Sequence, residues 1–360
     1  MILRILTIFA ALMAVSGAAR AADNWPPATE HDFIIHDFRF ASGETLPQLR
    51  IHYRTLGTPR RDASGRIVNA VMVLHGTGGD GTTFLRPIFA GVLFSPGGLL
   101  DASKDFIILP DGIGHGGSSK PSDGLRMRFP KYAYDDMVRA EHALVTEGLG
   151  VQRLRLLMGT SMGCMHAFMW GERWPEAVQA LMPLACLPVQ IAGRNRTWRK
   201  MIIDLIENDP AWQGGEYRSP PLEGLRGAQS LLAIAGSAPL PNQLAYPTRD
   251  QADAALEKRM AAAITSADAN DLIYAVSASR DYDPSRDLER ITVPVTWVNS
   301  GDDFINPPEL GIAEREVKRM PDARFVLIPA GPDTYGHGTH TVASLWKDRL
   351  AELLQRSEGR

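Results

Sequence analysis

The 360-residue sequence predicts an α/β fold with a mostly parallel central sheet flanked by helices. Short, almost continuous apolar runs recur along the chain, and such runs are typical of strands buried on both faces of a parallel sheet. Helix-forming segments lie between several runs, and this alternation indicates right-handed strand–helix–strand crossovers. The apolar runs cover residues 71–74, 106–109, 154–158, 180–184, 293–298 and 325–328.

Composition excludes several classes of protein. The chain has 38 Lys and Arg against 41 Asp and Glu, a net charge of −3, which gives no electrostatic basis for binding nucleic acid or an anionic membrane. Its hydrophobic fraction of 44% is ordinary for a soluble protein with a full core. The two cysteines, Cys164 and Cys186, cannot form a four-thiolate metal site. We interpret Cys164 as a small buried residue; a bridge to Cys186 is the alternative in an oxidising compartment.

Residues 1–21 have the pattern of a secretory signal peptide. A basic start at residues 1–4 is followed by an apolar run at 5–15 and by the small-x-small sequence 19–21. The run is shorter than the ~20 residues that span a bilayer, which argues against a membrane anchor. We therefore expect cleavage near Ala22 and an exported, periplasmic or secreted protein with no stable membrane insertion after cleavage.

The remaining elements follow in order along the chain. Alternating polarity in residues 33–54 predicts two antiparallel strands. Residues 134–149 predict a helix, with acidic residues at its start and glycine at its end. Residues 188–280 break the rhythm with proline-rich turns and a helical run at 253–267, which predicts a helical cap inserted between two strands. The α/β core would then comprise residues 22–187 and 281–360.

Residues 159–163, Gly-Thr-Ser-Met-Gly, are the strongest chemical signal. They follow a predicted strand and precede helical spacing, the context of a G-x-S-x-G nucleophile elbow. Glycines at both ends leave room for a strained turn that exposes the Ser161 hydroxyl. The Met162 amide would lie at the helix start, where a developing oxyanion is stabilised. We predict Ser161 as nucleophile and Met162 as an oxyanion-hole donor.

A second oxyanion-hole donor is expected after the strand at residues 71–74. That strand leads into His75-Gly76-Thr77-Gly78-Gly79, where small residues let backbone amides approach a substrate oxygen. We predict the Thr77 amide as donor, with the Gly78 amide as the next candidate, and we expect Gly78 to contribute to substrate binding. A phosphate-binding loop is the competing interpretation, but no lysine follows in the loop. His75 is interpreted as structural, and His115 as part of the pocket wall.

The general base and its partner acid should follow Ser161 in the order acid, then histidine. Asp302 and Asp303 come directly after the strand at 293–298, and we choose Asp303, with Asp302 as the alternative acid or a turn cap. His337 lies between glycines on the last loop and can reach Ser161 as general base.

His340 is interpreted as supporting His337. Two histidines three residues apart also occur in metal sites, but no third ligand cluster supports that interpretation. We therefore expect no metal and no cofactor.

Taken together, these residues resemble the α/β-hydrolase superfamily and, within it, the homoserine O-acetyltransferase family. The resemblance covers most of the chain from about residue 112 onward and implies the α/β-hydrolase fold. It favours His337 over His340, implies that Arg199 binds a substrate carboxylate through its planar guanidinium, and implies a cap that can serve as a homodimer surface. The matching segments are residues 159–165, 195–199, 208–217, 221–225, 268–274 and 335–337.

Two departures from that family favour hydrolysis over acyl transfer. Residues 112–119 are closer to general esterases than to the family's longer loop, and the spacing from Arg199 to Asp209 is longer than usual. An exported enzyme would also find no acetyl-CoA, although both activities share an acyl-serine intermediate. We therefore predict an exported serine hydrolase that cleaves a small carboxylic ester; the alternatives are an O-acyltransferase that uses an acyl-CoA donor, and a non-catalytic binding protein on the same fold.

Overall fold

The computed structural model describes residues 24–359. The predicted signal peptide lies outside this range. Within residues 24–359, no helix combines the length and apolar character that a membrane crossing requires.

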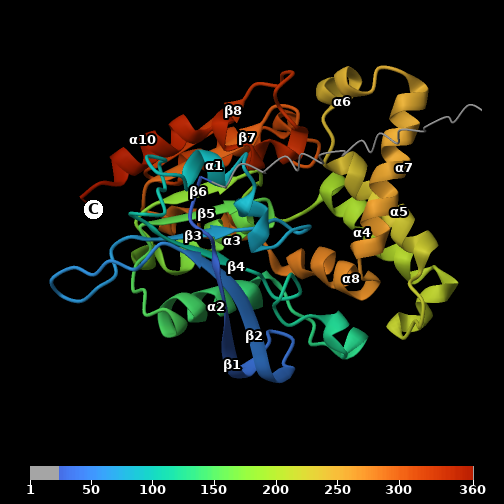
Figure 1. Cartoon of the computed structure of the whole chain (residues 1–360), viewed down its shortest axis with the longest axis horizontal. Helices are drawn as coiled ribbons and strands as arrows, with labels where there is room; N and C mark the ends of the chain where they lie inside the picture. Colours follow the sequence, from blue (N-terminus) through green and yellow to red (C-terminus); the bar gives the residue numbers. More distant parts are fainter. Residues whose placement is uncertain (1–23, 360) are drawn as a thin grey trace, which may run out of the picture.

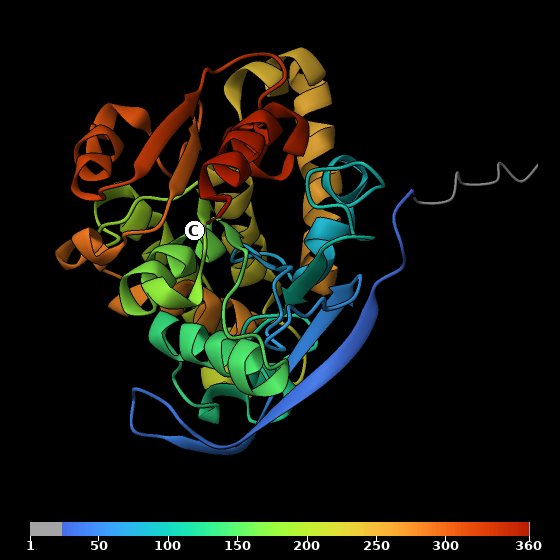
Figure 2. The same cartoon turned by 90° about the vertical axis from the view of Figure 1, so that its left-hand side faces the viewer.

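Eight strands of the described chain form one sheet in the order β1-β2-β4-β3-β5-β6-β7-β8. The first two strands pair antiparallel to each other, and β2 pairs antiparallel to β4. All other neighbours are parallel, which confirms the predicted mostly parallel sheet. Figure 2 shows β1 and β2 as a long curved pair at the edge of the sheet. The strands are β1 (Thr29–Arg39), β2 (Thr45–Leu56), β3 (Ala70–Leu74), β4 (Phe106–Pro110), β5 (Leu156–Thr160), β6 (Leu181–Leu184), β7 (Val295–Ser300) and β8 (Ala323–Ile328).

Helices cover both faces of the sheet (Figure 1). Met72 and Leu74 of β3 pack in one apolar cluster with α2 (Tyr134–Ala143) and α3 (Met162–Arg173). The intervening residues Val71 and Val73 pack in a second cluster with α1 (Ala90–Leu93) and α10 (Lys347–Ser357). Alternate residues of one strand thus face different helices, which is why the buried strands have no polar side in the sequence.

Some predicted boundaries were wrong. The helix predicted over 134–149 stops being α-helical at Ala143 and continues as a π-helical turn, Leu144–Gly148. The strand predicted over 154–158 begins at Leu156 and runs on to Thr160, directly before Ser161. Similarly, β7 runs to Ser300 because polar Asn299 and Ser300 are buried in the sheet.

Five α-helices lie between β6 and β7, and we call them the cap helices. They have an apolar core of their own, which includes Trp198, Ile202, Leu225 and Ile273. Figure 1 shows them gathered at one end of the sheet. They are α4 (Gly193–Glu207), α5 (Leu222–Ala235), α6 (Pro239–Ala245), α7 (Arg249–Ser266) and α8 (Ala269–Ser277); one further helix, α9 (Ile312–Glu316), follows β7.

Cys164 and Cys186 form a disulfide, with Cα atoms 5.9 Å apart. The interpretation of Cys164 as an unpaired small residue was therefore wrong, and the alternative of a bridge is confirmed. The physical reason is topological: β5 and β6 are neighbouring parallel strands, so the residues that follow their carboxyl ends lie within bridging distance. The disulfide connects the first turn of α3 to the segment that leads toward the cap helices.

Replacing both cysteines with serine is expected to lower the free energy of unfolding by about 3 kcal/mol, since the bridge closes a loop between residues 22 apart. Urea unfolding of the double variant beside the wild-type protein measures this difference. Wild-type protein unfolded in dithiothreitol is the control, because reduction should reproduce most of the loss. Equal midpoints for the oxidised wild type and the variant would contradict a stabilising role.

Candidate active site

Ser161 occupies a strained turn between β5 and α3. Its backbone has φ 54° and ψ −108°, a conformation that costs about 1–3 kcal/mol for a residue with a side chain. The flanking glycines make the turn feasible. A Cβ on Gly159 would lie 2.0 Å from the Gly163 oxygen, and one on Gly163 would lie 2.2 Å from the Leu74 oxygen. The sequence-based explanation of the two glycines therefore agrees with the geometry.

The structure brings Ser161, His337 and Asp303 together. His337 Nε2 lies 2.8 Å from Ser161 Oγ, and His337 Nδ1 lies 2.9 Å from Asp303 Oδ2. His337 is on the loop after β8, and Asp303 is on the loop after β7. The three residues thus form a chain of hydrogen bonds, although 176 positions separate serine from histidine.

Asp303 is held as a buried carboxylate by several donors. Its Oδ1 accepts from the backbone N–H groups of Ile305 (2.8 Å) and Asn306 (3.2 Å), and its Oδ2 accepts from the Asn306 side-chain amide (3.0 Å). Burial raises the pKa of Asp303, but His337 and these hydrogen bonds outweigh burial and leave that pKa below its ordinary value. Asp303 therefore stays ionised and can orient His337.

Asp302 has a different role in the structure. Its Oδ1 accepts from the Ser300 hydroxyl (2.5 Å), and its Oδ2 accepts from the Thr334 hydroxyl (2.7 Å) and the Gly336 N–H (3.2 Å). These partners tie together the loops after β7 and β8. Asp302 thus supports the loop that carries His337 and does not contact His337 itself through a hydrogen bond.

His340 packs against His337 with ring centroids 5.2 Å apart. Burial lowers the pKa of His340 to about 3, so its ring is neutral at ordinary pH. Among residues 24–359 no group of three or more His, Cys, Asp or Glu side chains could hold a metal ion.

The predicted oxyanion residues flank Ser161. Met162 is the first residue of α3. Gly76, just before Thr77, lies so close to the serine that a Cβ on it would be 3.1 Å from Ser161 Cβ. The position of a Cβ on Gly78 faces open space, with no atom within 4 Å apart from those of its chain neighbours. A hydrogen bond from the Gly163 N–H to the His75 oxygen joins the start of α3 to the segment after β3.

Comparison with known proteins identifies the family. Residues 69–336 match a family model described as the alpha/beta hydrolase fold. The chain belongs to the α/β-hydrolase family. The expected resemblance to homoserine O-acetyltransferases within this family is confirmed as well. A homoserine O-acetyltransferase of Geobacter sulfurreducens is 28% identical, over 88% of this chain and 95% of that protein.

Other relatives include both acyltransferases and esterases. A probable acyltransferase of Methanothermobacter thermautotrophicus is 31% identical, over 82% of this chain and 89% of that protein. The crystal structure of an acetylester hydrolase from Corynebacterium glutamicum has the same fold, with a TM-score of 0.79 and 22% identity, over 91% of this chain and 96% of that one. The protein is thus an enzyme of the α/β-hydrolase superfamily.

Arg199 of this α/β-hydrolase is a buried cation on α4. Its Nε donates to Asn195 Oδ1 at 3.0 Å, and its Nη1 lies 3.4 Å from Ser279 Oγ. Its guanidinium lies 4.8 Å from the Trp198 ring centroid. Within residues 24–359, no ion pair between Arg199 and an Asp or Glu is present. Burial lowers the pKa of Arg199, so the arrangement leaves a desolvated guanidinium without a carboxylate counterion.

Tyr134 is a fully buried residue near the Arg199 charge, and sequence reasoning missed it. Its hydroxyl is buried and, like Thr77 Oγ1, has no hydrogen-bond partner among the described residues. Burial raises the pKa of Tyr134, so the phenol is neutral. Its place as the first residue of the predicted helix over 134–149 was the available signal, because that helix begins at the same edge of the sheet as Ser161.

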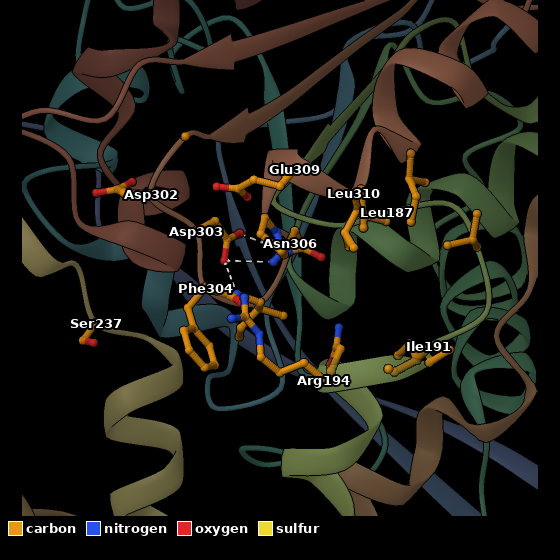
Figure 3. A pocket seen from close by; sticks show the side chains of 18 of the residues that line it. Leu187, Ile191, Arg194, Ser237, Asp302, Asp303, Phe304, Asn306, Glu309 and Leu310 are labelled. Atoms are coloured by element: carbon orange, nitrogen blue, oxygen red, sulfur yellow. Dashed lines mark hydrogen bonds between the residues drawn. The ribbon is translucent and has the colours of Figure 1, made fainter.

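A cavity of about 1130 Å³ adjoins the triad on the Asp303 side (Figure 3). One wall comes from α4 and α5, with Arg194 and Ile234, and the other comes from the loop after β7, with Phe304 and Leu310. Arg194 donates to the Phe304 oxygen and lies 3.9 Å from the Phe304 ring centroid, which connects the two walls. Ser161 and His337 do not line this cavity.

Proposed function

We propose that the protein is a serine hydrolase that cleaves a small carboxylic ester. One observation carries the proposal: His337 lies within hydrogen-bonding distance of both Ser161 Oγ (2.8 Å) and Asp303 Oδ2 (2.9 Å). This arrangement of nucleophile, base and orienting acid supports acyl transfer through a covalent serine intermediate.

In this mechanism Ser161 Oγ attacks the ester carbonyl carbon as its proton moves to His337 Nε2. The carbonyl oxygen becomes an oxyanion that accepts from the Met162 and Thr77 amides. The carbon–oxygen bond to the alcohol then breaks, and His337 protonates the departing alkoxide. Water attacks the acyl-Ser161 carbon and gives a proton to His337; collapse releases the acid and returns the proton to Ser161. Asp303 stabilises the His337 imidazolium in both halves.

We propose further that the enzyme is exported and releases the acyl group to water. The signal-peptide pattern of residues 1–21 and the buried Cys164–Cys186 disulfide support an oxidising compartment outside the cytoplasm. Acyl-CoA donors are cytosolic, so an exported acyltransferase would lack its donor. Water is available in such a compartment and would accept the acyl group from acyl-Ser161.

The alternative is an O-acyltransferase that uses an acyl-CoA donor. The unpaired Arg199 guanidinium favours it, since a planar cation in a dry site suits the carboxylate of an amino-acid acceptor. The relatives described as a probable acyltransferase and a homoserine O-acetyltransferase also favour it. Both activities use the same acyl-Ser161 intermediate and differ in what attacks it.

Turnover of p-nitrophenyl acetate and butyrate by the chain without residues 1–21, with and without acetyl-CoA plus homoserine, separates the two functions. The hydrolase proposal expects ester cleavage and no O-acetylhomoserine. Efficient formation of O-acetylhomoserine would overturn both hydrolysis and export.

Replacing Arg199 with methionine is expected to raise KM for carboxylate-bearing esters or acceptors by about 10–100-fold, because a hydrogen bond to a charged group contributes about 1.5–3 kcal/mol. For the neutral p-nitrophenyl butyrate, we expect a change within about 3-fold, since no carboxylate is present to bind. Arg196→Met, on the exposed face of the same helix, is the matched control. Equal effects on neutral and anionic substrates would contradict a carboxylate-binding role.

We also propose that the cap helices form a homodimer surface. Large apolar side chains are exposed on four of these helices and the segment after α6, and a second copy would bury them. Sedimentation velocity at micromolar concentration tests this, and a monomer alone would contradict it. The exposed residues are Met201, Leu205, Leu222, Ile234, Leu240, Leu244, Tyr246 and Leu256.

A further inference from the structure

Two buried histidines outside the triad contact the loop that carries the proposed oxyanion donor. His75 and His115 are 2% and 7% exposed, and their ring centroids lie 5.0 Å apart. Neither contacts Ser161 or His337 through a hydrogen bond. Each instead faces a backbone carbonyl of the loop at residues 76–78. Their contacts therefore bear on how this loop is held.

The tautomer of His75 follows from its partners. The Gly112 N–H donates to His75 Nε2 at 2.9 Å, so that nitrogen carries a lone pair. Burial lowers the pKa of His75 to about 3, and the neutral ring therefore has its one proton on Nδ1. This Nδ1–H donates to the Gly76 oxygen at 2.8 Å, and the Gly79 N–H donates to the same oxygen at 3.0 Å.

Holding the Gly76 carbonyl fixes the Thr77 amide. The two groups belong to one trans peptide unit, in which the carbonyl and the N–H point in opposite directions. Gly76 itself lies against the nucleophile, since a Cβ on it would be 3.7 Å from Ser161 Oγ. A donor on the carbonyl also polarises the peptide and strengthens its N–H as a donor. His75 is thus placed to orient and to strengthen the Thr77 N–H.

His115 makes the corresponding contact with the next peptide. Its Nε2 lies 3.0 Å from the Thr77 oxygen, and its Nδ1 lies 3.0 Å from the Ile113 oxygen. Both neighbours are acceptors, and burial lowers the pKa of His115, so its single proton serves one of them at a time. With the proton on Nε2, His115 holds the Thr77 carbonyl and turns the Gly78 N–H the opposite way.

We propose that His75 and His115 are positioning residues for the oxyanion hole: His75 acts through Nδ1–H on the Gly76 carbonyl, and His115 through Nε2–H on the Thr77 carbonyl. The inference rests on the proposed function, because it assumes an oxyanion at Ser161. Neither ring touches the substrate, and neither transfers a proton.

Crossed substitutions test which ring nitrogen matters. An asparagine amide reaches the position of Nδ1, and a glutamine amide reaches that of Nε2. His75→Asn therefore keeps the donor to Gly76, and His75→Gln loses it. At the second position the order reverses, because His115→Gln keeps the donor to Thr77 and His115→Asn loses it.

For p-nitrophenyl butyrate we expect His75→Gln and His115→Asn to lower kcat by about 10–100-fold with little change in KM, since loss of a whole oxyanion donor costs about 10²–10³-fold. His75→Asn and His115→Gln should stay within about 3-fold of the wild type. The inhibition constant of an aryl trifluoromethyl ketone should rise in parallel with the loss of kcat, because its hemiketal on Ser161 places an anionic oxygen in the same hole.

Melting temperatures and a remote variant separate positioning from folding. His142 stacks on Trp174 at 4.0 Å, away from this loop, and His142→Asn should lower the melting temperature without changing kcat. Equal kcat losses for asparagine and glutamine at both positions, in proportion to lost stability, would overturn the proposal. Activity in His115→Asn but not in His115→Gln would overturn the part that concerns His115, because the proton would then lie on Nδ1.

Failure of the proposed function itself has a distinct signature. A serine-directed fluorophosphonate should label the wild-type protein at Ser161. Absence of that label would overturn the hydrolase mechanism and the positioning roles together. A labelled wild type with no crossed pattern would overturn the positioning roles alone.

Discussion

Replacing Ser161 with alanine is expected to lower kcat for p-nitrophenyl butyrate by about 10⁶-fold, the scale seen when a serine nucleophile is removed. The acyl-serine intermediate cannot form without the Ser161 hydroxyl. Any remaining hydrolysis would require direct attack of water on the ester, without a covalent intermediate. The only hydrogen bond of Ser161 Oγ among the described residues is with His337, so the fold should tolerate the change. The measurement is steady-state hydrolysis together with the melting temperature.

Fluorophosphonate labelling provides the control for this prediction. The wild type should gain one adduct, and Ser161→Ala should gain none. Ser64→Ala, on an exposed loop where the serine bonds only to Asp62, should label and hydrolyse like the wild type. A label that persists in Ser161→Ala would show that another residue is the nucleophile.

The fold was predictable because its central strands are buried on both faces. Every residue of β3 to β6 is buried, so these strands stand out in the sequence as apolar runs between helices. The ends of the strands were less predictable. Asn299 and Ser300 are polar, yet tertiary contacts keep them inside β7: the Asn299 amide donates to the Cys186 oxygen, and the Ser300 hydroxyl donates to Asp302. No local sequence pattern indicates these hydrogen-bond partners of Asn299 and Ser300.

The closeness of Ser161 and His337, the proposed nucleophile and base, was predictable from local chemistry and chain order. A nucleophile-elbow serine requires a histidine later in the chain, and His337 Nε2 lies 2.8 Å from Ser161 Oγ. The choice between Asp302 and Asp303 was a different problem. Both are carboxylates on one loop, and only its path in space turns Asp303 toward His337 and Asp302 toward Thr334 and Gly336.

Contacts between distant segments were not predictable. His115 reaches Thr77 across 38 positions, and Gly112 reaches His75 across 37. Both contacts arise because β3 and β4 are adjacent parallel strands, whose following loops meet at one edge of the sheet. From the sequence we interpreted His75 as structural and His115 as part of the pocket wall. The sequence could not indicate which backbone carbonyl each ring faces.

The two candidate activities of the site differ in the group that attacks acyl-Ser161. In both proposed functions the triad and the oxyanion loop would transfer the acyl group to Ser161. These groups therefore do not indicate whether water or an alcohol accepts the acyl group. Other groups would have to select the acceptor. Arg199 is buried and has no carboxylate partner within residues 24–359. Comparison of Arg199→Met on neutral and anionic substrates therefore tests specificity, whereas the Ser161 variant tests chemistry.

Replacing Asp303 with asparagine is expected to lower kcat by about 10⁴-fold, as in triads where the acid becomes an amide. Oδ1 of Asp303 faces two backbone N–H donors, so the asparagine oxygen must take that side. Its NH₂ group then faces His337 Nδ1 and the Asn306 amide, both of which donate in the wild type. His337 can relieve the clash only by moving its proton to Nε2, where it no longer accepts the Ser161 proton.

The ionisation of Asp303 should also make the folding stability of the wild-type protein depend on pH. The folded-state pKa of Asp303 is depressed, so the carboxylate contributes stability above its unfolded pKa of about 3.9 and loses that contribution as pH falls through the lower folded value. Asp303→Asn lacks the contribution at every pH. Urea midpoints of the two proteins should therefore differ most near neutral pH and converge below about pH 4.

Asp302→Asn is the matched control, because it changes the neighbouring carboxylate in the same loop. Asp302 accepts from Thr334 and Gly336, so its loss should loosen the loop that carries His337 and lower the melting temperature. Asp303 would still accept the hydrogen bond from His337, so we expect kcat to fall by less than about 10-fold. If Asp302→Asn were the inactive variant and Asp303→Asn the active one, the acid would be misassigned, and the hydrogen bond between Asp303 and His337 would have no catalytic meaning.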